Sequence, residues 1–139
     1  MDNENLISTF EATIQEHENQ LFGIALFNEG IKHLYKNNQA ILETTAFHYR
    51  QTMERGLKAV SEAKELLLEV KKGNIKAELL REFEFPPIHG AGLDEMTERA
   101  TLLVEAFEKL FPEKQRTLSL TKEEHLELMH EAAKNWDGD

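Results

Sequence analysis

The feature that most constrains the fold is an unbroken run of residues at spacings of three and four. It begins near the N-terminus and comprises Ile7, Phe10, Ile14, His17, Leu21, Ile24, Asn28, Ile31 and Tyr35. Residues at these spacings share one face of an α-helix. The run therefore predicts a helix from about residue 4 to about residue 36, roughly 50 Å long at 1.5 Å per residue.

A second run with the same spacing extends from about residue 38 to residue 72. Lys71 and Lys72 favour the negative end of the helix dipole, and Gly73 can adopt the left-handed conformation that ends a helix. Between the two runs, the pair Asn37-Asn38 can supply the residue that ends the first helix. We therefore predict that residues 4–72 form a long antiparallel hairpin.

The rest of the chain predicts shorter helices. Asn74 can cap a helix over 75–84, the loop 85–92 contains Pro86-Pro87, and apolar spacing predicts helices over 93–111 and 121–136. The last of these opens with a capping box, in which Thr121 and Glu124 satisfy each other's backbone amides. The predicted fold is a single all-α domain over 1–139, four-helix-bundle-like, with two shorter helices and a short connecting helix packed on the hairpin.

Composition excludes several classes of protein. The chain has no cysteine, so disulfides and thiol catalysis are excluded. A net charge of −10 repels phosphate backbones, so we expect no direct binding to nucleic acid. The N-terminus is polar and acidic, and the longest apolar run is far shorter than the roughly 20 residues that span a bilayer. We therefore expect a cytoplasmic protein without membrane association.

That apolar run, Leu21 to Phe27, is apolar on every side of its helix. A helix in a small bundle normally keeps one face in water, so this segment has to be covered on both sides. Either the shorter helices cover it or a second subunit does. We expect the second arrangement, a homodimer whose interface is formed by Leu21, Phe22, Ile24, Leu26 and Phe27.

Two polar residues also lie on the predicted core face of the first helix. His17 and Asn28 either fix the register of the helices, as polar groups at core positions do, or contact a small ligand. The first interpretation is the simpler one.

Signals for catalysis are weak. The serines at positions 8, 61 and 119 stand in no glycine-rich elbow, and Glu127-x-x-His130 has no second copy to complete a di-metal site. The remaining candidate is a Mg²⁺ site formed by glutamates on two consecutive predicted helices, namely Glu62, Glu65, Glu78 and Glu82.

This spacing resembles that of the all-α nucleotide pyrophosphohydrolases. Members of that family hold Mg²⁺ through a Glu-x-x-Glu on one helix and a Glu-x-x-Asp on the next. Glu62 and Glu65 match the first pattern, whereas Arg81 stands where the second pattern has its aspartate. The resemblance covers about 25 residues and implies, as an alternative, a Mg-dependent phosphohydrolase that acts on a nucleotide.

The acidic C-terminal half suggests a different function. Residues 74–139 contain 15 acidic and 8 basic side chains. If the last two helices are neighbours, their outer faces form a negative surface that suits a basic protein partner. We therefore predict a non-catalytic helical interaction module (an adaptor, inhibitor or chaperone-like protein) without a cofactor. Its partner-binding residues would be Glu98, Glu105, Glu108, Glu123, Glu127 and Glu131.

Overall fold

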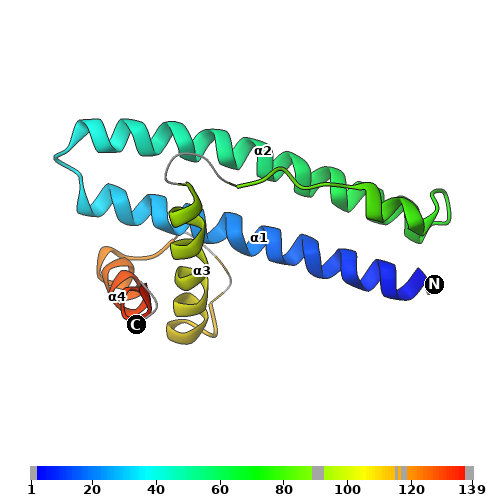
Figure 1. Ribbon diagram of the computed structural model, residues 1–139. Coiled ribbons are helices and arrows are strands. Elements are labelled where there is room, and N and C mark those ends of the chain that lie inside the picture. Colours follow the sequence, from blue (N-terminus) through cyan, green and yellow to red (C-terminus); the bar gives the residue numbers. More distant parts are fainter. Residues whose placement is uncertain (1–2, 89–92, 115, 117–118, 137–139) are drawn as a thin grey trace.

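The computed structural model describes residues 3–88, 93–114, 116 and 119–136 (Figure 1). Over these residues the chain is all-α and contains no strand, which confirms the predicted fold class. Within them, no helix combines the length and apolar character that crossing a membrane requires. The elements are the helices α1 (Asn3–Leu34), α2 (Gln39–Lys71), α3 (Leu93–Leu110) and α4 (Lys122–Ala133), and a 3₁₀ helix, η1 (Ala77–Glu82).

The helices α1 and α2 form the long antiparallel hairpin that the apolar spacing predicts (Figure 1). Gly73 ends α2 with a φ of +83°, the left-handed conformation expected there. The turn between the helices differs in one respect from the prediction. Asn38 is extended and caps the start of α2, because its side-chain oxygen accepts a hydrogen bond from the backbone nitrogen of Ile41 at 3.2 Å.

The connecting segment is shorter than predicted. An α-helix over 75–84 was expected, whereas the structure has the single 3₁₀ element η1, which begins after Lys76 without a side-chain cap. Asn74 does not cap it, because its side-chain amide donates to the Glu69 carboxylate of α2 at 2.8 Å. After η1 the chain runs back along the hairpin and packs Phe83, Phe85 and Ile88 against it (Figure 1).

The central element of the fold is α1, which contacts every other helix of the described chain. While α2 lies along one side of α1, α3 runs across α1 and α4 lies beside α3 (Figure 1). The capping box at the start of α4 is present as predicted, since Thr121 and Glu124 each accept a hydrogen bond from the other's backbone amide.

The chain itself covers the segment that is apolar on every side. On one side, Leu21 belongs to a core cluster shared with α2 and η1, and on the other, Leu26 belongs to a cluster shared with α3 and α4. Leu21, Ile24 and Leu26 are 2%, 0% and 0% exposed. Phe22 and Phe27 pack against the second cluster. The segment is thus covered within one chain: Leu21, Ile24 and Leu26 are core positions, and Phe22 and Phe27 are half-buried against the second cluster. The homodimer itself stays a prediction.

Two glycines let other helices approach α1 closely. A Cβ at Gly23 would lie 2.3 Å from the carbonyl oxygen of Ala100 on α3, so the two backbones are in direct contact. A Cβ at Gly30 would lie 2.7 Å from the sulfur of Met129 on α4. These contacts fix where α3 and α4 cross α1, and so they also fix the groove between α1 and α3.

Candidate functional site

A groove lies where α3 crosses the middle of α1. It has a volume of about 210 Å³. Its lining comes from one turn of α1 and from residues of α3 at spacings of three and four, namely Glu16, Asn19, Gln20, Thr101, Val104, Glu105 and Glu108. We call this feature the acidic groove.

Three carboxylates line the acidic groove, and no basic side chain does. Glu108 is neutralised by an ion pair with Arg116. Glu16 and Glu105 are exposed and form no ion pair with any other described residue. Two glutamates from different helices, each without an ion pair, therefore line one concavity, and like charges so placed favour a cationic group.

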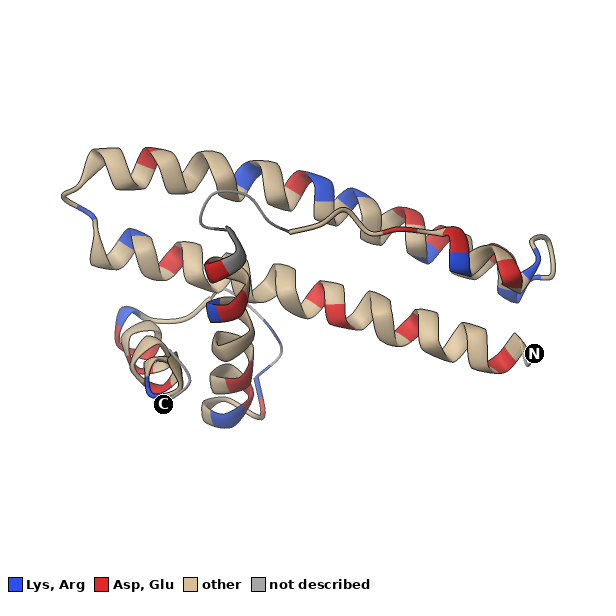
Figure 2. Cartoon of the chain, viewed as in Figure 1, with Lys and Arg blue, Asp and Glu red and all other residues tan. Residues whose placement is uncertain are grey.

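The six glutamates predicted to bind a partner do not all line the acidic groove. Acidic residues occur on both α3 and α4 (Figure 2). Glu105 and Glu108 line the acidic groove, and Glu98 is exposed on the same stripe of α3, seven residues before Glu105. Glu123 and Glu127 are exposed on α4 and do not line the groove.

Glu131 has a structural role instead. It is only 9% exposed and accepts hydrogen bonds from Lys109 of α3 and from Lys134. These bonds lower the pKa of Glu131 from 4.5 to about 2. The carboxylate thus joins α4 to α3 and, unlike the prediction, does not lie free on an outer face.

The contribution of α1 to the groove was not predicted. Glu16, Asn19 and Gln20 lie on the polar side of α1, where no local pattern distinguishes them from other solvated residues. They become part of a groove because α3 crosses α1 at Gly23 and Ala100, a contact between residues far apart in the sequence.

The glutamates of the predicted Mg²⁺ site do not come together to form a metal-binding group. Within the described residues, no group of three or more His, Asp or Glu side chains is arranged to hold a metal ion. Glu62 and Glu65 are exposed on α2, and Glu78 and Glu82 are exposed on η1. Glu127 and His130 are exposed on α4 and likewise have no third ligand there. The resemblance to the pyrophosphohydrolases therefore does not extend to a shared ion site.

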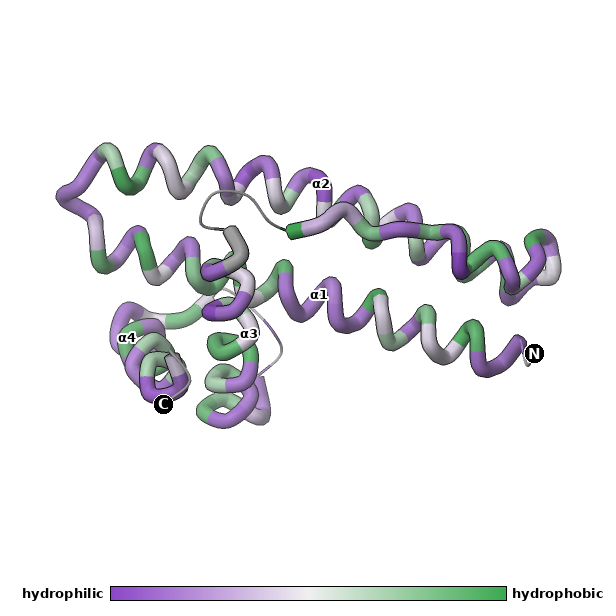
Figure 3. Tube along the Cα trace, viewed as in Figure 1, coloured by the Kyte–Doolittle hydropathy of each residue, from purple (hydrophilic) through white to green (hydrophobic). Residues whose placement is uncertain are grey.

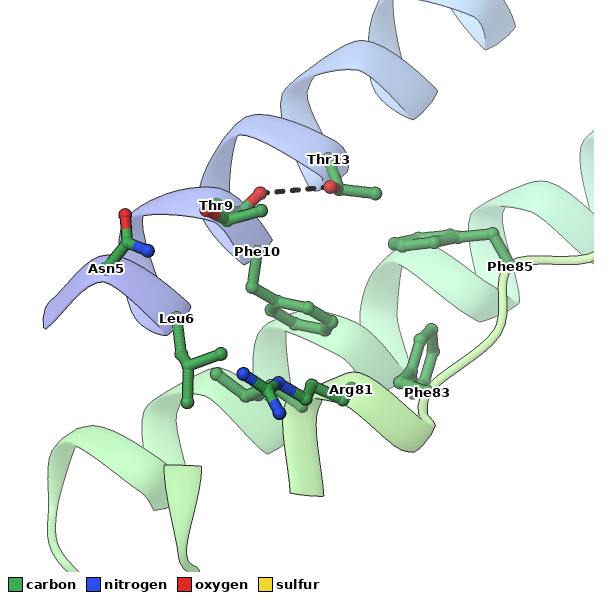
Figure 4. Close-up of a pocket in the computed structure, with 9 residues that line it drawn as sticks. Asn5, Leu6, Thr9, Phe10, Thr13, Arg81, Phe83 and Phe85 are labelled. Carbon is green, nitrogen blue, oxygen red and sulfur yellow. Dashed lines mark hydrogen bonds between the residues drawn. The ribbon is translucent and has the colours of Figure 1, made fainter. Parts of the chain in front are cut away.

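A larger pocket, of about 370 Å³, lies between the start of α1 and η1 (Figure 4). Three phenylalanines line it, and the ring of Phe10 is edge-on to that of Phe83 at 5.7 Å between centroids. The Thr13 hydroxyl donates to the Thr9 carbonyl at 2.9 Å. The apolar residues of its walls belong to the core cluster of the hairpin or pack against it, and its one charged side chain, Arg81, already interacts within the chain.

The two polar residues on the core face of α1 are buried as predicted. His17 is 6% exposed, its ring stacks on Phe85 at 4.6 Å between centroids, and burial lowers the pKa of His17. Asn28 is 3% exposed and lines a separate cavity between α1 and α2. They do not share a cavity, which favours the interpretation that each fixes local packing.

Comparisons of the chain with models of known protein families, with curated proteins and with solved structures found no match.

Proposed function

We propose that this chain is a non-catalytic helical interaction module that binds a basic segment of a partner protein in the acidic groove. The observation that carries this proposal is the pair of exposed carboxylates, Glu16 and Glu105, which face one groove without a counter-ion from the described chain.

The chemistry of the groove suits an arginine side chain. A guanidinium has five N–H donors and binds carboxylates through charge-assisted hydrogen bonds. Beyond the two carboxylates, the side-chain oxygens of Asn19, Gln20 and Thr101 can accept further bonds. Val104 offers an apolar contact for the aliphatic stem of the incoming side chain.

The charge of the whole chain supports the same kind of partner. A net charge of −10 steers a basic protein toward this one, and the exposed carboxylates of Glu98, Glu123 and Glu127 add to that field. Binding of this kind weakens as salt rises, because exposed charges are screened over about 10 Å at 0.1 M. A module of this kind would act as an adaptor, an inhibitor or a chaperone-like protein, without chemistry of its own.

The test uses a short arginine-containing peptide, acetyl-Gly-Arg-Gly-amide, titrated into the labelled protein and followed by NMR. We expect shifts at Glu16, Thr101 and Glu105. The variant E16Q/E105Q should bind at least about tenfold more weakly, since each charge-assisted bond contributes roughly 1.5–3 kcal/mol. The matched control is E123Q/E127Q, which removes the same charge from α4 and should change binding less than threefold.

Affinity capture from a lysate of the host then serves to identify the natural partner. A protein retained by the wild type and by E123Q/E127Q, but lost from E16Q/E105Q, would support the groove as the binding site. An equal loss from both double variants would show that only the overall charge matters. The proposal would then be refuted.

A further inference from the structure

The outer face of α2 carries a regular stripe that points away from α1. The stripe follows spacings of three and four, and every residue in it is exposed. Its members, which we call the α2 seam, are Glu43, Phe47, Arg50, Glu54, Leu57, Ser61, Glu65, Leu68 and Lys72. Figure 3 shows that hydrophobic and hydrophilic residues alternate along α2.

Three large apolar side chains of the seam are left uncovered. Phe47, Leu57 and Leu68 are 51%, 55% and 52% exposed. The opposite side of α2 is the one that packs on α1, with Gly56 against Leu21. The described chain thus covers one side of α2 and leaves the seam, with its regularly spaced apolar residues, open.

We propose that the α2 seam is a homodimer interface, in which α2 packs antiparallel to α2 of a second copy. An antiparallel pairing centred between residues 57 and 58 places Phe47 opposite Leu68 of the partner subunit. In the same register, Arg50 lies opposite Glu65 of the partner subunit, and Glu43 lies opposite Lys72 of the partner subunit. The two Leu57 side chains meet at the two-fold axis.

Charge complementarity argues for a second copy rather than a different protein. Arg50 and Glu65 are 15 residues apart, about 22 Å along one helix, and cannot pair within one chain. Neither has an ion pair among the described residues. Lys72 has only an exposed contact with Glu69 at 3.7 Å. In a two-fold dimer each cross-chain pair forms twice, so one stripe of sequence satisfies itself.

The net charge of the seam also favours a second copy as its partner. It holds three acidic and two basic residues, a net of −1, whereas the whole chain has −10. Two copies therefore repel each other less through this face than the charge of the whole chain implies. With three apolar positions among nine, the dimer should be weak, with a dissociation constant on the order of micromolar. The seam lies on α2 and shares no residue with the acidic groove, so either proposal can fail alone.

Sedimentation equilibrium of the full chain measures the dimer directly. We expect R50E and E65R each to weaken it at least about tenfold, because each places like charges opposite one another twice. The double variant R50E/E65R restores opposite charges and should return to within about threefold of the wild type. The matched controls are R55E and E62R, which make the same charge changes at exposed positions of α2 outside the seam.

Introduced cysteines can test the register of the dimer, because the chain contains no cysteine of its own. In the proposed pairing, Glu54 lies opposite Ser61 of the partner subunit. A mixture of E54C and S61C should form a mixed disulfide under mild oxidation much faster than either variant forms one with itself. Circular dichroism confirms that each variant is folded.

A wild-type chain that stays monomeric up to about 1 mM, far above a micromolar dissociation constant, would overturn the proposal. The proposal would also be overturned if R50E/E65R dimerised no more tightly than R50E alone. The same holds if a control variant weakened the dimer as much as R50E does.

Discussion

Replacing Gly23 with alanine tests whether α3 rests directly on the backbone of α1. The new Cβ would lie 2.3 Å from the carbonyl oxygen of Ala100 and 2.7 Å from its carbonyl carbon. Both are backbone atoms, so α3 has to move by about 1 Å to restore van der Waals contact. Leu103 and Phe107 on that helix are 0% and 1% exposed, and moving them disrupts the core.

Overpacking of this kind costs up to about 3 kcal/mol. Alanine regains about 1 kcal/mol over glycine through helix propensity, so we expect a net loss of about 2 kcal/mol in the free energy of unfolding. For a domain of this size that lowers Tm by about 7 °C. Urea unfolding followed by circular dichroism measures the loss.

Gly30 provides a matched control on the same helix. A Cβ there would meet the sulfur of Met129 at 2.7 Å and its methyl carbon at 2.9 Å, the end of a flexible side chain. Methionine can change rotamer, so G30A should lie within about 1 kcal/mol of the wild type. If G23A is as stable as G30A or more so, the direct contact between the two backbones is refuted.

Two further predictions concern pH. Because Lys109 and Lys134 lower the pKa of Glu131 to about 2, its stabilising effect should be complete above pH 4.5 and fade as pH falls toward 2. Urea unfolding of E131Q should therefore differ from the wild type at pH 6 and converge with it at pH 2; a constant difference would contradict the assignment. Burial lowers the pKa of His125, so the unfolded chain takes up a proton below pH 6.5 before the folded one does. The free energy of unfolding should therefore fall as pH drops below 6.5, and it should fall less steeply in His125→Leu than in the wild type. Equal slopes in the two proteins would contradict this.

Local features of the fold follow from the sequence because they depend on neighbours along the chain. The spacing of apolar residues predicts the hairpin, Gly73 ends α2 as expected, and Thr121 with Glu124 forms the predicted capping box. The exception is Asn74. It has the right side chain to cap a helix, but its amide bonds to Glu69 instead, and only a 3₁₀ turn follows.

Contacts between segments that are far apart in the chain could not be predicted from the sequence. The pattern of Leu21 to Phe27 shows that both sides of α1 are covered, but not by what, and the structure supplies α2 on one side and α3 with α4 on the other. Glu131 looked like its neighbours on α4, and its burial depends on Lys109, 22 residues away. Glu16 enters the acidic groove only because α3 crosses α1 at Gly23.

The central position of α1 has a consequence for synthesis on the ribosome. The segment from Leu21 to Phe27 emerges before Phe107 and Leu128, which cover one side of it and are made about 80 to 100 residues later. At about 5–20 residues per second, that side stays open to solvent for roughly 4 to 20 seconds. During this interval the nascent hairpin presents an apolar strip that chaperones recognise and that favours aggregation. The folded protein hides this strip, so the time of greatest risk comes before α4 exists.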